Sequence, residues 1–448
     1  MKIKEIEIRS LFGYFHHKIP LRMKERITII HGPNGVGKTT ILRLVNDLFA
    51  SRFYSLFAIP FDSIIIHFDP KGNLTVTRTK PAGAEATPKL TLTYRIGSKR
   101  TEHKVTLISE VEARKRFPLS MIERIIENLE RIGPSEWRDE ITGKSLSLGD
   151  VLVHYGHLLP SDFRSGITPV PEEITNLLKG VHIALVETQR LFTEPRVEDA
   201  SYTYHRRSEG PTQRMTVEQY SEDMIQRIQN YQREAGVLGA SLDSTYPHRI
   251  LRADLPDEAT EQSIRKLYSM QSEYRDRLMK AGVIAAETPV SLPAGGLTEN
   301  ERKVLWIYLD DVEHKLKVFD PLLRRVELFK DIVNSRFSYK KFGVDREKGF
   351  IFKSNYSDSV VPPRALSSGE QHEIVLTYQL LFKAQAGSLI FIDEPELSLH
   401  VTWQRKFLED IGRISELADL DFLVATHSPS IINNRRDLMV KLASEKEA

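Results

Sequence analysis

Residues 32–39 read Gly-Pro-Asn-Gly-Val-Gly-Lys-Thr and fit the pattern G-x-x-x-x-G-K-[ST] at every fixed position. The residues before them, 26–31, form a short β-branched run typical of a buried strand, and the residues after Lys38 have the apolar spacing of a helix. Three glycines let the backbone turn tightly enough for successive N–H groups to face one anion, and the helix dipole adds positive potential there. The stretch therefore predicts a strand, a glycine turn and a helix that together bind a polyphosphate.

The side chains of this phosphate loop, residues 32–39, predict its chemistry. We expect the ammonium of Lys38 to reach the β and γ phosphates of ATP, and the hydroxyl of Thr39 to ligate Mg²⁺. A chance glycine-rich turn is the alternative, but eight fitting positions between a strand and a helix disfavour it. The other residues expected to contact the nucleotide here are Gly32, Asn34, Gly35, Gly37 and Thr40.

The composition sets few limits on function. The 448 residues suffice for two or more folding units, and 63 basic against 61 acidic residues neither require nucleic acid nor exclude a local basic patch. The absence of cysteine from the sequence excludes disulfides, zinc–thiolate sites and thiol nucleophiles. The N-terminus lacks the apolar core of a signal peptide, and no stretch has the length of a membrane helix. We therefore expect a soluble cytoplasmic protein with no membrane partner.

A second apolar run ends on two carboxylates. Residues 388–392 read Ser-Leu-Ile-Phe-Ile and lead directly into Asp393 and Glu394. At the carboxyl end of a buried strand, Asp393 can hold the Mg²⁺ whose other ligand is Thr39, and Glu394 can take a proton from an attacking water. Either acid alone is compatible with an ordinary surface position. The pair, in a chain that also has a phosphate loop, predicts a hydrolytic site.

Two further motifs can reach the same nucleotide. Ser367 and Glu370 have the spacing of a capping box ahead of an apolar helix, and Ser367 with Gly369 can also face a phosphate at that helix N-terminus. Residues 421–426 form a predicted strand that ends at His427, whose imidazole can contact a γ-phosphate or hold the attacking water. Taken alone, this histidine would be a core or turn residue.

The intervening sequence changes character along the chain. Residues 1–100 read as strands with one helix, residues 121–129 carry one apolar helical stripe that Pro134 ends, and residues 180–190 read as a buried strand ending near Gln189. Pro321 is expected to kink or divide the last long helical segment. The three long helical segments are predicted at residues 217–236, 258–281 and 298–334.

The order of these motifs resembles that of the ATP-binding cassette (ABC) ATPases. The long, helix-rich interval between the phosphate loop and Ser367 is similar to the SMC and RecF branch rather than to transporters. Within this branch, Glu-Thr-Gln-Arg-Leu at 187–191 and Asp-Glu-Pro-Glu-Leu-Ser-Leu-His at 393–400 resemble the OLD-type ATPases of bacterial anti-phage defence. The likeness is greatest to the ATPase subunits of two-component systems, AriA of PARIS and, second, PtuA of Septu.

The resemblance implies an α/β fold, an ABC-type ATPase head with a mixed sheet, a P-loop α/β core and an inserted helical arm or lid. It implies that Gln189 contacts Mg²⁺ and the γ-phosphate and couples them to lobe movement, and that Ser367 and Gly369 contact the ATP of a second subunit. We expect an N-terminal lobe at 1–194, a helical arm at 195–340 and a C-terminal lobe at 341–448. Val401 stands where OLD-type relatives often have proline, which leaves the geometry of the neighbouring loop open.

The implied function is a slow, regulatory ATPase that forms a head-to-head dimer or a larger even-numbered oligomer. It would hold or activate a separately encoded effector, a Toprim-type or HNH nuclease or a toxin, until a phage-encoded trigger protein arrives. OLD nucleases continue into a Toprim domain after the histidine and this sequence does not, so we expect no nuclease activity of its own.

Two other functions stay open from the sequence. One is a RecF-like ATPase of DNA repair or maintenance that binds duplex DNA through basic stretches such as 112–116 and 338–342, although such runs are usually solvated faces. The other is a scaffold that binds ATP without turnover.

Overall fold

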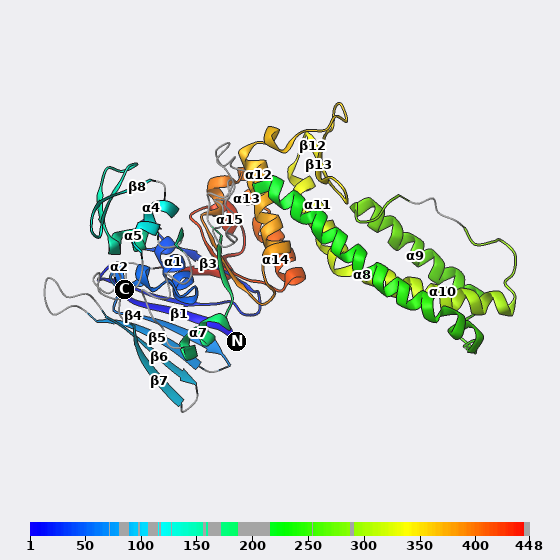
Figure 1. The fold of residues 1–448 in the computed structure, drawn as a ribbon, viewed down its shortest axis with the longest axis horizontal. Coiled ribbons are helices and arrows are strands. Elements are labelled where there is room, and N and C mark those ends of the chain that lie inside the picture. The colour runs from blue at the N-terminus through cyan, green and yellow to red at the C-terminus, as the bar shows by residue number, and fades with distance from the viewer. Residues whose placement is uncertain are drawn as a thin grey trace. The chain divides into compact units, whose positions relative to one another are not determined.

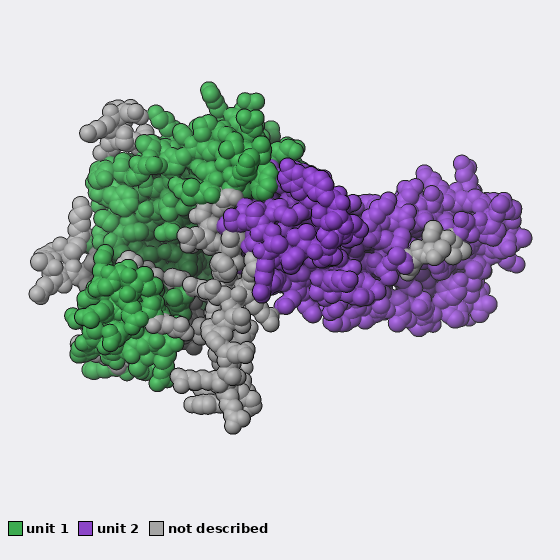
Figure 2. All heavy atoms as spheres, turned by 90° about the horizontal axis from the view of Figure 1, so that it is seen from above, with its two compact units in different colours: residues 1–189, 194–212, 384–448 green, residues 190–193, 213–383 purple. Residues whose placement is uncertain are grey.

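The computed structural model describes residues 1–70, 72–79, 89–96, 99–105, 115, 118–126, 128–155, 158–159, 172–186, 216–252, 254–286 and 291–442. The chain forms two compact units, coloured separately in Figure 2. Unit 1 comprises residues 1–189, 194–212 and 384–448, and unit 2 comprises residues 190–193 and 213–383.

Unit 1 contains a five-stranded sheet in the order β11, β14, β15, β3, β16, in which every neighbouring pair is parallel. Strands β3, β14 and β15 each bury four consecutive residues, the pattern of strands that are covered on both faces. Asp393 pairs with Ala425, and Ala425 pairs with Ile30, so the three strands end at one edge. The strands are β3 Ile27–His31, β11 Ile183–Val186, β14 Leu389–Asp393, β15 Asp421–Ala425 and β16 Met439–Lys441.

A second sheet of unit 1 is antiparallel and has six strands in the order β2, β1, β4, β5, β6, β7 (Figure 1). Helix α1, Lys38–Phe49, shares one hydrophobic core with apolar residues of both sheets, so the phosphate loop enters the centre of the unit. The strands are β1 Lys2–Leu11, β2 Phe15–Pro20, β4 Ser63–Asp69, β5 Gly72–Thr79, β6 Lys89–Ile96 and β7 Lys99–Val105. The short helices after β14 and β15 are η5 Pro395–Ser398, α13 Val401–Gln404, α14 Phe407–Ala418, α15 Pro429–Ile432 and η6 Arg436–Leu438.

A small lobe of unit 1 corrects one prediction. The apolar stripe at 121–129 is not one helix, because α4 ends at Ile125 and Leu129 begins strand β8. Leu129 packs in a core with the fully buried Trp137. The run 121–129 is too short for its apolar spacing to distinguish a helix from a strand, so its tertiary contacts determine the conformation. The elements of this lobe are α4 Ser120–Ile125, β8 Leu129–Gly133, β9 Glu136–Asp139, β10 Ser145–Ser147 and α5 Leu148–Tyr155. Helix α2 Phe53–Ala58 contributes Tyr54 to its core, whereas α7 Glu172–Lys179 packs in the core around α1.

Unit 2 is largely helical, with one hairpin. The predicted segment 298–334 is divided at Phe319 into α10 and α11, and Pro321 lies in the first turn of α11, as predicted. The ring of Phe329 packs against aromatic side chains from the hairpin and from the segment after α12. The elements are α8 Thr216–Arg252, α9 Glu261–Ala281, α10 Glu299–Lys317, α11 Asp320–Arg336, β12 Lys340–Asp345, β13 Gly349–Ser354, η3 Pro363–Ala365, α12 Ser368–Tyr378 and the π-helical η4 Gln379–Lys383.

The predicted mixed α/β class is confirmed by the combination of parallel and antiparallel sheets with long helices. Unit 2 extends to residue 383 because α11, the hairpin and α12 pack around Phe329. The division into lobes and arm at residues 194 and 340 stays a prediction. Over the described ranges, none of the helices combines the length and the hydrophobicity needed to cross a bilayer.

Candidate active site

The phosphate loop joins the end of β3 to the start of α1. Gly35 and Gly37 have φ angles of 84° and 95°, which glycine adopts without the strain that a Cβ would cause. Gly37 is the N-cap of α1, and in the described part of the chain no side chain caps this helix of twelve residues. An uncapped helix N-terminus keeps backbone N–H donors for an anion. The loop therefore has the backbone that binding of a polyphosphate requires.

Close packing fixes this loop against its neighbours. A Cβ on Gly37 would lie 2.7 Å from Cδ2 of Leu11, and a Cβ on Gly32 would lie 2.9 Å from the carbonyl oxygen of Leu442. The buried His17 donates from Nε2 to the carbonyl oxygen of Val36, with the two atoms 2.9 Å apart. Burial lowers the pKa of His17 by more than this hydrogen bond raises it. The sequence did not predict this support, because the contact joins residues 19 positions apart within a segment read only as strands.

Lys38 lies beneath the loop and is only 5% exposed. Its ammonium donates to two carbonyl oxygens of its own loop, at 2.9 and 3.1 Å. Burial lowers the pKa of Lys38, and the charges of Glu394, Asp393 and Glu396 oppose this shift. The structure thus brings the loop lysine together with the two carboxylates at the end of β14, and it adds a third carboxylate.

The carboxylates lie where β14 ends. Glu394 follows the strand with φ 44° and ψ 56°, a left-handed conformation that is uncommon outside glycine. Its N–H donates to the carbonyl oxygen of Ala425 at 2.9 Å, so β15 holds the backbone in this conformation. Strained residues of this kind are found preferentially at functional sites, which supports a role for Glu394 beyond packing.

His427 lies beside Glu394 at the same edge. Its Nε2 is 3.9 Å from Oε1 of Glu394, and its ring centroid is 6.5 Å from that of His31 at the end of β3. The side chains of Glu394 and His427 are 33% and 32% exposed, so a bound molecule can reach both. The sequence pointed to both residues but not to Glu396, which accepts hydrogen bonds from the turn that carries His427. Its position two residues after Glu394 was the available signal.

The signature residues Ser367 and Gly369 belong to unit 2. Ser367 caps α12 and accepts from the N–H of Glu370 at 3.3 Å, while the carboxylate of Glu370 accepts from the N–H of Ser367 at 2.7 Å. The predicted capping box is therefore confirmed. Lys340 donates to both carboxylate oxygens of Glu370 at 2.8 Å, which holds the cap in place. Ser367 itself is exposed.

The other residues predicted to contact the nucleotide lie in the phosphate loop, in the first turn of α1 and at Gln189. Asn34 and Gly35 are exposed at the crest of the loop, and Thr39 and Thr40 are half-buried in the first turn of α1. Gln189 lies outside the described residues, so its role stays a prediction.

The donor set fits a nucleotide with Mg²⁺. The uncapped N-terminus of α1 and the buried ammonium of Lys38 supply the positive potential that phosphates need. Mg²⁺ prefers oxygen ligands, and the hydroxyl of Thr39 and the carboxylate of Asp393 are of that type. Both belong to elements that end or begin at the carboxyl edge of the parallel sheet.

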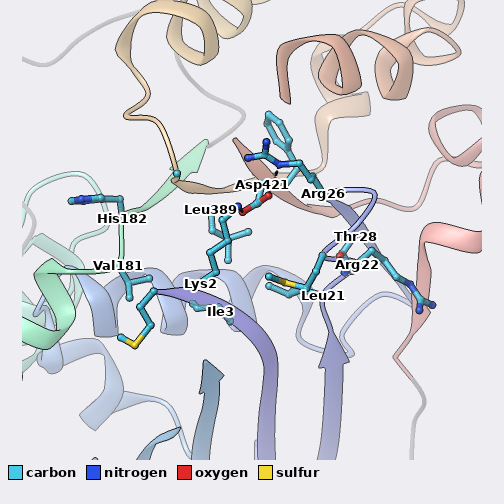
Figure 3. A pocket seen from close by; sticks show the side chains of 14 residues that line it. Lys2, Ile3, Leu21, Arg22, Arg26, Thr28, Val181, His182, Leu389 and Asp421 are labelled. Carbon is cyan, nitrogen blue, oxygen red and sulfur yellow. Dashed lines mark hydrogen bonds and ion pairs between the residues drawn. The ribbon is translucent and has the colours of Figure 1, made fainter. Parts of the chain in front are cut away.

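A separate hollow of about 20 Å³ lies at the opposite, amino-terminal ends of these strands (Figure 3). There Lys2 and Arg26 both donate to the carboxylate of Asp421 at 2.7 Å. Pockets that bind small molecules are about ten times larger or more, so this hollow is a structural feature of the sheet edge.

Residues 248–433 match the family described as "AAA domain, putative AbiEii toxin, Type IV TA system". The match includes the signature, the two carboxylates and His427, and it covers less than half of the chain. Among curated proteins, none matches the chain.

Similar solved structures are SMC heads. A head bound to the C-winged helix domain of ScpA has 9% identity and a TM-score of 0.34 over 97% of this chain and 92% of that one. A head with an extended coiled coil from Pyrococcus furiosus, bound to the C-terminal domain of ScpA, has 11% identity and a TM-score of 0.34 over 99% and 94%. The Thermotoga maritima SMC head has 11% identity and a TM-score of 0.32 over 98% and 94%. The match at residues 248–433 and the phosphate loop at 32–39 together make the chain similar to P-loop ATPases of the AAA type.

Proposed function

We propose that the chain binds ATP with Mg²⁺ and hydrolyses it at the carboxyl edge of its parallel sheet. The observation that carries this proposal is the register of the parallel strands, because Asp393 pairs with Ala425 and Ala425 pairs with Ile30, so the carboxylates at the end of β14 and the phosphate loop after β3 lie at one edge. The charges of Glu394 and Asp393 accordingly act on the ammonium of Lys38. A group that binds phosphate, a group that holds a metal and a group that accepts a proton therefore share one edge.

Each group of the chain has a distinct part in this reaction. The loop N–H groups and Lys38 bind and orient the phosphates. Thr39 and Asp393 hold Mg²⁺, which when bound neutralises the charge of the phosphate oxygens. Glu394 accepts the proton of the attacking water, and His427, 3.9 Å away, orients that water or contacts the γ-phosphate. Gln189 is proposed to report the state of this site to the rest of the chain.

We infer that a second copy of the chain completes each site. Ser367 is exposed at the N-terminus of α12, a helix of eleven residues, and its oxygen accepts the capping bond, so its O–H can still donate. Such a helix end, with Gly369 beside it, suits a γ-phosphate held by another subunit. Two heads would then enclose two nucleotides, in a dimer or a larger even-numbered oligomer.

The proposed partner is a separately encoded effector, a Toprim-type or HNH nuclease or a toxin, which the oligomer holds until a phage-encoded trigger arrives. The family description names a toxin and a type IV toxin–antitoxin system, which supports a part in such a system over a part in DNA maintenance. Lys340, from the second basic stretch, is bound to Glu370, which makes this stretch less suited to contact phosphates of DNA.

The experiment measures phosphate release and particle mass with MgATP. We expect slow turnover by the wild type and an ATP-dependent increase from monomer to dimer mass. Ser367→Arg is expected to prevent this increase while the monomer still binds ATP, and Ser357→Arg, at another exposed serine of unit 2, is the matched control. Dimerisation of Ser367→Arg with ATP would contradict the paired-head proposal, and co-purification with the product of the adjacent gene tests the effector.

A further inference from the structure

We propose that Glu396 is a positioning residue that fixes His427 beside Glu394. This inference rests on the proposed ATP hydrolysis and adds a residue to which neither the motifs nor the family match assigns a role. Glu396 lies in η5, the short helix that begins directly after Glu394.

One carboxylate collects three donors from the turn that carries His427. Oε1 of Glu396 accepts from the N–H of His427 at 2.7 Å and from the N–H of Ser428 at 3.1 Å. Oε2 accepts from the hydroxyl of Thr426 at 2.8 Å, and Thr426 is fully buried. Hydrogen bonds to an ionised acceptor are about twice as strong as neutral ones, so this turn is held firmly.

A second contact ties the same turn to the segment after Glu396. The hydroxyl of Ser428 donates to Oε1 of Gln404 at 2.7 Å, and Nε2 of Gln404 donates to the carbonyl oxygen of Leu399 at 3.0 Å. Gln404 is 8% exposed, so these bonds are shielded from water. We name Glu396, Thr426, Ser428 and Gln404 the Glu396 clamp.

The clamp is needed because the sheet does not hold this histidine. Strand β15 ends at Ala425, and the N–H groups of His427 and Ser428 donate to Glu396 rather than to a neighbouring strand. Glu394 and Glu396 lie on one short segment, so the clamp and the hydrogen bond from Glu394 to Ala425 together set the spacing between Glu394 and His427. The charge of Glu396 also acts on the ammonium of Lys38 in the phosphate loop.

The alternative is a purely structural role, in which Glu396 only stabilises the start of α15, where Ser428 is the N-cap. A purely structural role predicts a lower Tm and a loss of activity that multiplies with that of any catalytic variant. A positioning role predicts that the loss is already contained in the loss caused by removing His427.

The test compares Glu396→Ala, Glu396→Gln, His427→Ala and the double variant Glu396→Ala/His427→Ala in steady-state ATP hydrolysis. A misplacement of about 1 Å costs up to about 100-fold, so we expect Glu396→Ala to lower kcat by about 10- to 100-fold, with KM changed less than about threefold. The double variant should be no slower than the slower single variant. Glu396→Gln keeps a carbonyl acceptor for both N–H groups and should retain most of kcat.

Two further measurements complete the test. Hydrogen exchange at the His427 and Ser428 amides should be faster in Glu396→Ala than in Glu396→Gln, and Glu409→Ala, at an exposed glutamate of α14, should change neither exchange nor kcat. If Glu396→Ala does not fold, Gln404→Ala releases Ser428 alone and should lower kcat with the same non-additivity. Unchanged kcat in Glu396→Ala or Gln404→Ala, or losses that multiply with His427→Ala, overturn the clamp alone. A wild type without turnover overturns the proposed function and the clamp with it.

Discussion

Units 1 and 2 position their predicted phosphate ligands by different means. In unit 1 the backbone does it, because strand ends, left-handed glycines and the strained Glu394 define where the side chains start. In unit 2 charged side chains do it, because the carboxylate of Glu370 accepts from the N–H of Ser367 and is held in turn by Lys340. The site of unit 1 should therefore respond mainly to changes of shape, and the signature helix of unit 2 mainly to changes of charge.

The charge network of unit 2 continues along α12. Arg336 and Glu373 form an ion pair at 3.6 Å with side chains only 2% and 6% exposed. Near the end of α12, Asp223 of α8 accepts from the hydroxyl of Tyr378 at 2.5 Å and from Lys383 at 2.7 Å. The helix that presents Ser367 is thus joined to α8 and α11 by ionised groups.

The largest expected effect is catalytic and lies in unit 1. Glu394→Gln keeps the shape of the side chain but cannot accept a proton, so kcat should fall by about 100- to 10,000-fold while ATP still binds. Phosphate release and titration calorimetry measure the two quantities. Glu416→Gln, at an exposed position of α14, is the control. Turnover within about threefold of the wild type would remove Glu394 from the reaction.

The next effect is on stability in unit 2. Glu373→Ala removes the carboxylate beside the buried guanidinium of Arg336, and loss of one partner of a buried pair costs about 3–5 kcal/mol. Urea denaturation of the full chain measures this loss. The double variant Arg336→Met/Glu373→Leu should be more stable than Glu373→Ala, since it leaves no buried charge. A loss below about 1 kcal/mol for Glu373→Ala would show that charge does not hold α12.

A smaller effect should depend on pH. Burial alone would raise the pKa of Asp223, but hydrogen bonds from Lys383, Tyr378 and Arg227 outweigh it and lower the pKa below the ordinary 3.8. The stabilisation is therefore complete above that value and is lost as the pH falls through the lowered pKa. Asp223→Asn should cost about 2 kcal/mol at pH 7 and less at pH 3. If Asp223→Asn lowered the free energy of unfolding equally at pH 7 and pH 3, the stabilisation could not come from the negative charge of Asp223.

The smallest effect sharpens the comparison. Lys340 and Glu370 are 23% and 14% exposed at their side chains, so their pair is partly screened and Lys340→Ala should cost about 1 kcal/mol or less. ATP binding by the monomer should not change. Lys353→Ala, whose partner Asp358 is 83% exposed, is the control and should cost less. High salt should reduce the difference between the two variants.

Much of the fold and of the candidate site could be predicted from local patterns. Apolar runs that end on Asp393 and His427 predicted two strands, because continuous apolar runs of this length are typical of strands that are buried on both faces. The capping box at Ser367 was predicted for a similar reason, since it depends on residues only three apart.

The rest depends on contacts between distant segments. The hydrogen bonds from His17 to Val36 and from the His427 turn to Glu396 join residues 19 to 32 positions apart, and no local periodicity encodes them. Strand β8 was not predicted because Leu129 continues the helical spacing of the residues before it. In the structure Leu129 begins β8 and packs in one core with Trp137. Local sequence thus predicted which residues can bind phosphate or metal or accept a proton. Contacts between distant segments determine which of these residues are held in position.

Strand β15 is anchored at both ends. Asp421 at its start accepts from Lys2 and Arg26, and the turn after its end donates to Glu396. A shift of one residue in its pairing would break both anchors together and would turn the inward side chains outward. Contacts at both ends of this five-residue strand therefore stabilise one register. The same register places His427 at the site, so the strand cannot pair correctly without positioning this side chain.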